Sequence, residues 1–369
     1  MRIAILTLPL HANYGGILQC YALQTVLERM GHKVEVLITP SFAYPALSIW
    51  ARIAVWSKRF FETFIIRKYS TFYGWRTNGE IISFHTKIFV QQYIHIRKIC
   101  DLSILKEQNY EAIVVGSDQI WRPIFYRPIA NAYLAFAKDW KQIKRIAYAA
   151  SFGTDKWEYT LEETRECAAL LKLFDAVSVR EASAVQLCKN YFQIKAVHLL
   201  DPTLLLSKED YLSLDGVKNT PKHQGELFCY FLDETREKRQ WAEILCSKNG
   251  WKYFQANNPH IGEYVYENRV QQPLEPWLAG FRDAKFVLTD SFHGCAFSIL
   301  FNKPFVVIGN QERGMSRFNS LLTLFQLEDR LLLSERIDSI AERPIYWERV
   351  NQILNRERNK AFLFLKTLC

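Results

Sequence analysis

Short apolar runs alternate with amphipathic stretches along most of the chain, starting at its first residues. Residues 2–8 are largely apolar, residues 18–30 carry apolar side chains at helical spacing, and residues 33–38 are largely apolar again. Runs of this length are typical of buried strands, and Gly31 is placed to end the helix between them. The order of strand, helix and strand predicts the β-α-β unit that opens a doubly wound parallel sheet.

The same alternation continues to about residue 330. Further strands are expected at 112–115, 146–150, 176–179, 196–200, 226–232, 251–255, 286–288 and 305–308. Helices are expected at 161–172, 234–248, 275–282, 295–300 and 318–325. Because 369 residues exceed the usual size of one hydrophobic core, two domains are expected. We therefore predict an α/β protein with two Rossmann-like domains that face each other across a central cleft.

Changes in composition divide the chain into segments. The N-terminal Rossmann-like domain is expected at 1–204 and the C-terminal one at 226–343, joined by a polar, turn-rich linker at 205–225. One or two closing helices are expected at 344–369. An insertion at about 41–107 interrupts the N-terminal domain, and we expect it to form helical hairpins with one or two short strands.

The insertion is both basic and aromatic. Residues 51–100 hold nine Lys or Arg and two Glu, a net charge of +7, whereas the whole chain carries +9. Basic residues interleaved with aromatic ones suit an anionic membrane surface or an anionic polymer. The alternative is a solvated helical segment whose aromatic side chains face the core. No recognisable nucleic-acid-binding module accompanies the patch, so a nucleic-acid partner is not expected.

The composition favours a cytoplasmic enzyme without a membrane span. Hydrophobic residues make up 49% of the chain, but no apolar run approaches the ~20 residues that a spanning helix needs. The chain begins as a strand rather than as a charged and apolar leader, which argues against secretion. The eight Cys residues form no C-x-x-C pair, so we expect free thiols and no metal site.

Polar and charged residues follow the expected strands of the N-terminal half. They include the pair Gly15-Gly16, Ser117 with Asp118, Arg180 with Glu181, and Asp201. Ligands of open α/β sheets bind beyond the carboxyl ends of the strands, so these residues are expected to line a site. Asp201 precedes Pro202 and also fits a helix cap or a turn, and Glu181 fits an early-helix carboxylate. Arg180 fits no cap, because a cation near a helix N-terminus is disfavoured unless an anion lies between them.

The stretch 285–310 combines an expected strand, a polar turn and a helix. The turn places Ser291 and His293 beside the N-terminus of the helix that continues through Gly294 and Cys295. Free backbone N–H groups and the helix dipole favour an anion there, such as a phosphate or a carboxylate. The simpler interpretation is that His293 only caps the helix.

Six motifs follow one another at these strand ends. They are N-Y-G-G-x-L-Q-x-Y-A-L at 13–23, V-V-G-S-D-Q-x-W at 114–121, Y-A-A-S-F-G at 148–153, S-V-R-E at 178–181, L-D-P-T at 200–203 and T-D-S-F-H-G at 289–294. In this order they resemble the polysaccharide pyruvyl transferase family over about residues 1–330. The resemblance implies a fold like that of GT-B glycosyltransferases. It also implies transfer of the enolpyruvyl group of phosphoenolpyruvate to two sugar hydroxyls, which yields a pyruvate ketal and phosphate.

The resemblance also implies roles for single residues. Arg180 matches the family's donor-binding Arg, His293 matches its catalytic His, and Asp118 lies near an acidic strand-end position of the family. Many members have Arg two positions before the His, where this chain has Ser291. Because Ser cannot replace a bidentate Arg–anion contact, either the next loop supplies the charge or the donor differs.

A site for this reaction needs cations that bind the anionic groups of phosphoenolpyruvate, and it needs residues that carry out two proton transfers. His293 has the pKa range of an acid near neutrality and is expected to protonate the methylene carbon, with Asp118 as the base for a sugar hydroxyl. The groups expected to bind the donor or its phosphate are Gly15, Gly16, Ser117, Ser291, Gly294, Arg313 and Arg317. No cofactor is expected beyond phosphoenolpyruvate as a substrate.

Two other functions stay open at this point. The first is a GT-B glycosyltransferase that uses a nucleotide sugar, since a helix N-terminus holds a diphosphate equally well. The second is a non-catalytic protein that binds or assembles glycans. For the pyruvyl transferase, the expected partners are phosphoenolpyruvate, a sugar or lipid-linked oligosaccharide acceptor and the anionic inner face of the plasma membrane, which the basic insertion would contact peripherally.

Overall fold

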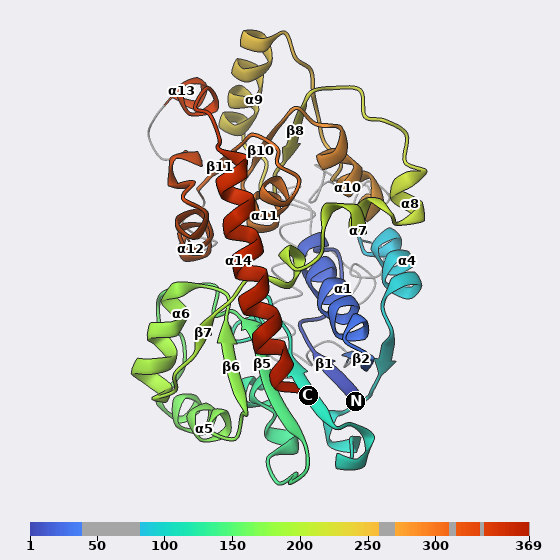
Figure 1. Ribbon diagram of the computed structural model, residues 1–369, viewed down its shortest axis with the longest axis vertical. Coiled ribbons are helices and arrows are strands. Elements are labelled where there is room, and N and C mark those ends of the chain that lie inside the picture. The colour runs from blue at the N-terminus through green and yellow to red at the C-terminus, as the bar shows by residue number, and fades with distance from the viewer. Residues whose placement is uncertain (39–81, 258–269, 310–314, 333–335, 369) are drawn as a thin grey trace, which may run out of the picture.

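Two parallel β-sheets form the framework of the protein (Figure 1). The computed structural model describes residues 1–38, 82–257, 270–309, 315–332 and 336–368. Residues 39–81, which contain most of the expected basic insertion, lie outside the described residues, so the structure does not test that prediction. The part of the insertion that is described holds helix α4 (Phe84–Tyr93) and strand β3 (Ile96–Lys98).

The N-terminal sheet has seven strands in the order β3-β2-β1-β4-β5-β6-β7, all parallel to their neighbours. The strands other than β3 are β1 (Arg2–Leu6), β2 (Lys33–Ile38), β4 (Ala112–Val115), β5 (Lys144–Ala150), β6 (Ala176–Val179) and β7 (Val197–His198). The central strand β1 is buried along all but its first residue, as its apolar sequence predicts.

Helices cover this sheet, and their ends follow sequence signals. Besides α4 they are α1 (Tyr14–Arg29), α5 (Leu161–Leu171) and α6 (Ala182–Leu187), which continues as a π-helical turn at Cys188–Phe192. Asn13 caps α1, and Thr160 and Glu163 form a capping box on α5. Single 3₁₀ turns lie at Leu102–Ile104, Glu107–Asn109, Ile129–Tyr133, Ala135–Ala137 and Pro202–Leu204.

The C-terminal sheet has five strands in the order β12-β11-β10-β8-β9, again all parallel. They are β8 (Leu227–Tyr230), β9 (Tyr253–Phe254), β10 (Phe286–Thr289), β11 (Phe305–Ile308) and β12 (Leu331–Leu332). The accompanying helices are α9 (Arg236–Asn249), α10 (Leu274–Asp283), α11 (Phe292–Leu300), α12 (Ser316–Phe325) and α13 (Ile337–Ala341), with 3₁₀ turns at Glu328–Arg330 and, near the C-terminus, Lys366–Leu368.

Two connections join the sheets. The segment expected as a polar linker contains α7 (Lys208–Leu212) and α8 (Asp215–Lys218), and buries Tyr211 and Val217. The last long helix, α14 (Trp347–Leu365), runs from the C-terminal sheet back to the N-terminal one (Figure 1).

One hydrophobic cluster contains buried residues of both sheets, among them Ile3 of β1 and Val287 of β10. The Tyr14 hydroxyl on α1 donates a hydrogen bond to the carbonyl of Gln272, 2.7 Å away. Gln272 lies two residues before the start of α10. The two domains therefore share part of their core, with the N-terminus of α1 turned toward the C-terminal sheet.

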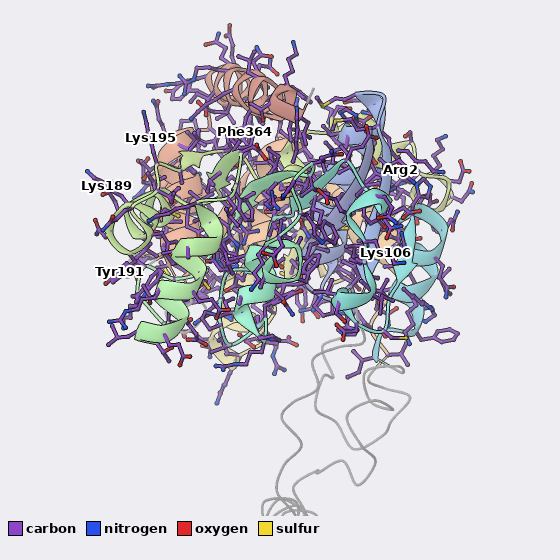
Figure 2. All side chains as sticks on the ribbon, turned by 90° about the horizontal axis from the view of Figure 1, so that it is seen from below. Arg2, Lys106, Lys189, Tyr191, Lys195 and Phe364 are labelled. Carbon is purple, nitrogen blue, oxygen red and sulfur yellow. The ribbon has the colours of Figure 1, made fainter. Side chains whose placement is uncertain are left out.

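The outer surface of the N-terminal domain carries basic side chains. Arg2, Lys106, Lys189 and Lys195 are exposed residues of this domain, which Figure 2 shows from below. Part of the positive charge of the chain is therefore carried by described residues that lie outside the insertion or at its end. No helix among the described residues combines the length and apolar character that crossing a membrane demands.

Candidate active site

The N-Y-G-G motif brings the two domains into contact at the start of α1. The Asn13 side chain accepts a hydrogen bond from the N–H of Gly16 and so caps the helix. Next along the chain, Gly15 packs directly against the imidazole of His293, and a Cβ atom at this position would overlap that ring. Glycine at position 15 is therefore what allows His293, from the C-terminal domain, to lie at the N-terminus of α1.

Arg180 forms a buried ion-pair cluster at the end of β6. Its guanidinium donates to Oδ2 of Asp201 at 2.8 Å and to Oδ1 of Asp118 at 3.1 Å, and its side chain is 1% exposed. These two carboxylates are the anions that a cation in this position requires. The hydroxyl of Ser117 donates to Oδ2 of Asp201 at 3.3 Å, which ties the ends of β4 and β7 together.

Asp118 holds a backbone conformation that is uncommon for a residue other than glycine. Its φ is 59°, in the left-handed region. Its carbonyl accepts hydrogen bonds from the N–H groups of Ile120 and Ser151, and these bonds fix the turn after β4. Strained backbone of this kind clusters at functional sites, where the surrounding structure holds it in place.

His293 lies in the first turn of α11 and is 5% exposed. Its Nε2 atom is 3.6 Å from Oδ2 of Asp201, a contact between the two domains. The helix cap is Ser291, whose hydroxyl accepts from the N–H of Gly294 at 3.3 Å. The simpler interpretation of His293 as a helix cap is therefore wrong, because Ser291 fills that position.

Two arginines lie over the ring of Phe292. The guanidinium carbon of Arg180 is 4.6 Å from the ring centroid, and that of Arg317, in the first turn of α12, is 5.9 Å from it. Such cation–π contacts stabilise guanidinium groups in a buried setting. Arg317 therefore belongs to the same buried group as Arg180 and His293.

The charges of the cluster shift its pKa values. Burial alone would raise the pKa of Asp118, but the positive charges of Arg180, His293 and Arg317 outweigh it and hold that pKa below its ordinary value. The pKa of Asp201 is lowered well below its ordinary value against the same opposing effect of burial, through His293 and Arg180. Burial and the neighbouring Arg180 lower the pKa of Arg317 to about 10. Both aspartates are therefore anions at neutral pH.

The structure brings together most of the residues that the sequence singles out. Gly15, Gly16, Ser117, Asp118, Arg180, Ser291, His293, Gly294 and Arg317 all lie around this interdomain contact. Arg313 lies outside the described residues. Among the described residues, no group of three or more His, Cys, Asp or Glu side chains is arranged to hold a metal ion.

Phe292 was not expected as a site residue, whereas Asp201 and Glu181 were expected near the site without a stated role. The ring of Phe292 packs against both guanidinium groups. Its position inside the motif T-D-S-F-H-G is the sequence feature that could have identified it. Asp201 does cap a 3₁₀ turn, as predicted, through Oδ1 and the N–H of Thr203, while Oδ2 serves Arg180. Glu181 stands at the N-cap position of α6, as expected of a carboxylate at a helix start, but its side chain makes no capping hydrogen bond there.

Comparison with known families classifies the chain. The family model described as polysaccharide pyruvyl transferase matches residues 13–312. The chain belongs to the polysaccharide pyruvyl transferase family. The match begins at the cap of α1 and ends just after β11, so it includes residues of both domains at the site. A search of curated proteins finds no match.

Solved structures that are similar to this protein share its fold at low sequence identity. A UDP-GlcNAc 2-epimerase from Neisseria meningitidis, bound to UDP-GlcNAc, aligns with a TM-score of 0.52 at 13% identity, covering 100% of this chain and 99% of the epimerase. The glycotransferase of kitacinnamycin aligns with a TM-score of 0.51 at 12% identity, covering 100% and 97%. These similarities confirm the predicted fold of two Rossmann-like domains of the GT-B type.

Proposed function

We propose that this protein transfers the enolpyruvyl group of phosphoenolpyruvate to two hydroxyls of a sugar, forming a pyruvate ketal and releasing phosphate. The observation that carries the proposal is the position of His293 at the interdomain contact, beside Asp201 and against Gly15. Within the described part of the chain, its buried Nε2 atom and the buried Nε of Arg180 have no hydrogen-bond partner. Unpaired polar atoms in a buried cluster are candidates for contact with a ligand.

The donor carries a phosphate and a carboxylate, so its site needs positive charge. Arg180 supplies no net positive charge of its own, because its two anionic partners, Asp118 and Asp201, outnumber it and leave the three side chains at −1. Arg317 adds a second guanidinium to the same buried group. We propose that Arg317 provides the cation that many relatives carry at the position of Ser291, whose own hydroxyl is used to cap α11.

The reaction moves two protons. One hydroxyl proton ends on the methylene carbon of the donor, which becomes the methyl group, and the other leaves with phosphate. A carboxylate with a lowered pKa and a fixed arginine partner is a weak base, which disfavours Asp118 for removing a hydroxyl proton. We therefore propose that His293 takes this proton, that Asp201 stabilises the resulting imidazolium, and that Asp118 orients Arg180.

The acceptor is proposed to be a sugar or a lipid-linked oligosaccharide, with peripheral contact to an anionic membrane. Membership in a family named for polysaccharides supports the sugar acceptor. The basic and aromatic composition of residues 51–100 supports the membrane contact. An anionic surface attracts such a segment within about a Debye length.

Donor identity can be tested by thermal shift and by phosphate release. Phosphoenolpyruvate is expected to raise the melting temperature, whereas UDP-, GDP- and CMP-sugars are not. With an acceptor present, we expect phosphoenolpyruvate-dependent release of phosphate, and His293→Ala should lower it by about 10²–10⁴-fold without changing the melting temperature. Stabilisation by a nucleotide sugar alone would favour a glycosyltransferase, and stabilisation by none of these ligands a non-catalytic protein.

A further inference from the structure

The carboxyl group of Glu181 has one oxygen that is fully used and one that is not. Glu181 follows Arg180 at the end of β6 and is completely buried. Its Oε1 accepts three hydrogen bonds, from the hydroxyl of Ser151 at 2.9 Å and from the N–H groups of Phe152 at 2.9 Å and Gly153 at 3.1 Å. Its Oε2 is buried and has no hydrogen-bond partner among the residues that the structure describes.

This asymmetry is what a protonated carboxyl group needs. The carbonyl-like oxygen Oε1 accepts from three donors, and the other oxygen carries the proton and has only a donor role to fill. An anionic carboxylate would leave a buried charged oxygen without a donor, which is costly. The turn 151–153 therefore fixes the orientation of the carboxyl group, with Oε2 as the oxygen that is left to carry a proton.

The electrostatic surroundings agree with this geometry. Burial raises the pKa of Glu181, and the charges of Arg180 and Arg317 together with the hydrogen bonds of Oε1 only partly offset it, so the pKa lies above its ordinary value. Burial, with a smaller contribution from the charge of Glu181, raises the pKa of the Cys188 thiol, on the turn after α6, to about 12, so this thiol stays neutral. Glu181 can thus keep its proton to a higher pH than an exposed glutamate.

We propose that Glu181 is the general acid that donates the proton of Oε2 to the methylene carbon of the donor. This assignment rests on the proposed enolpyruvyl transfer, which requires an acid for that carbon once His293 acts as the base. Two residues proposed to bind the donor, Arg180 and Arg317, interact electrostatically with this carboxyl group, and Arg180 directly precedes Glu181 in the chain.

The proton balance closes with these two residues. In the addition step a C–H bond forms from the Glu181 proton, a C–O bond forms between the first hydroxyl and the central carbon, and His293 receives the hydroxyl proton. In the second step the C–O bond to phosphate breaks and the second hydroxyl bonds to the same carbon. One of the two hydroxyl protons leaves with phosphate, and the other returns to Glu181. No oxidant, reductant or metal is needed.

The substitution Glu181→Gln separates this role from a structural one. The amide oxygen of Gln can accept the same three hydrogen bonds from the turn 151–153, but the side chain has no acidic proton. We expect kcat for phosphate release to fall by about 10²–10⁴-fold, with thermal stabilisation by phosphoenolpyruvate kept. The matched control is Glu166→Gln, on the exposed side of α5, which should keep wild-type turnover. A Glu181→Gln enzyme with more than a third of wild-type kcat would overturn the assignment.

A second measurement covers the case in which Glu181→Gln does not fold. In the wild-type enzyme the acid must be protonated, so kcat must fall as the pH rises through the pKa of Glu181. The charged groups that act on this carboxyl group are Arg180 and Arg317, and the nearby thiol of Cys188 is neutral. A kcat that does not fall with rising pH anywhere in the range over which the enzyme stays folded overturns the proposal. These outcomes are distinct from failure of the proposed function, because in that case the wild-type enzyme itself releases no phosphate from phosphoenolpyruvate.

Discussion

Asp201 and Asp290 have similar places in the two domains and different partners. Each is buried shortly beyond the carboxyl end of a parallel strand, and each pairs with a buried cation, Arg180 at 2.8 Å and Lys238 at 2.5 Å. Asp290 completes its bonds inside its own domain, accepting from the backbone N–H of Leu232 at 2.7 Å. Asp201 instead contacts His293 of the other domain.

The difference shows how a strand-end carboxylate acquires its role. Both residues stand in polar motifs after apolar runs, L-D-P-T and T-D-S-F-H-G, and local sequence does not separate them. The partner decides: a lysine on α9 makes Asp290 part of the domain core, whereas an arginine and a histidine make Asp201 part of the interdomain site. We expect substitutions of the first to affect stability and substitutions around the second to affect catalysis.

The largest expected effect is on stability, from Asp290→Ala. Removing the carboxylate leaves Lys238 buried without its ion-pair partner, so the free energy of unfolding should fall by about 3–5 kcal/mol. Urea unfolding measures this change. The double variant with Lys238→Met serves as the control and should recover part of the loss, because it removes the stranded charge. A loss below about 1 kcal/mol for Asp290→Ala would contradict a core role for the pair.

A smaller expected effect, on catalysis, comes from Gly15→Ala. The added methyl group overlaps the imidazole of His293 and must push it away from Asp201. We expect turnover to fall by about 100-fold, equivalent to about 2.7 kcal/mol, because the proton-transfer group is misplaced. Steady-state phosphate release measures it.

Gly31→Ala is the matched control for this substitution. Gly31 has a φ of 88° and open space around it, so alanine there should cost about 1 kcal/mol of stability and leave turnover unchanged. If Gly15→Ala kept wild-type turnover, the contact between Gly15 and His293 would have no part in catalysis.

The smallest expected effect is the acid dependence of stability. The pKa values of Asp118 and Asp201 are lowered in the folded protein, so their contribution to stability is complete above the ordinary value of 3.8 and is lost as the pH falls below it. We expect the two groups to account for a loss of about 1–3 kcal/mol between pH 5 and pH 2. Urea unfolding at several pH values should show a shallower decline for Asp201→Asn, and equal slopes would rule out this linkage for Asp201.

Much of the fold follows from the hydrophobic pattern. The strands Lys33–Ile38, Ala112–Val115, Ala176–Val179 and Phe305–Ile308 have the predicted bounds, because continuous apolar runs leave little choice for strands buried on both faces. The two-residue strand β12 was missed, since Leu331 and Leu332 are too few to form a pattern. The helices α7 and α8 were missed because a turn-rich composition hides the buried Tyr211 and Val217.

The candidate site was predictable as a set of residues but not as a set of contacts. Polar strand ends and the six motifs identify His293, Arg180 and Asp118, since strand ends of a parallel sheet meet at one edge. The ion pairs of Arg180 depend on residues 62 and 21 positions away in the chain. No periodicity encodes such distances, and the same holds for the contact of Gly15 with His293 across the domain boundary.

The return of α14 to the N-terminal domain determines when the site can be completed during synthesis. Arg358, on this helix, donates to the carbonyls of Leu204 and Leu206, just after Asp201. Lys144, at the start of β5, binds the carbonyls of Thr367 and Leu368. The first domain is thus held by residues that leave the ribosome more than 140 positions after its last strand. A nascent chain has both halves of the site long before it has the contacts that fix the segment after Asp201.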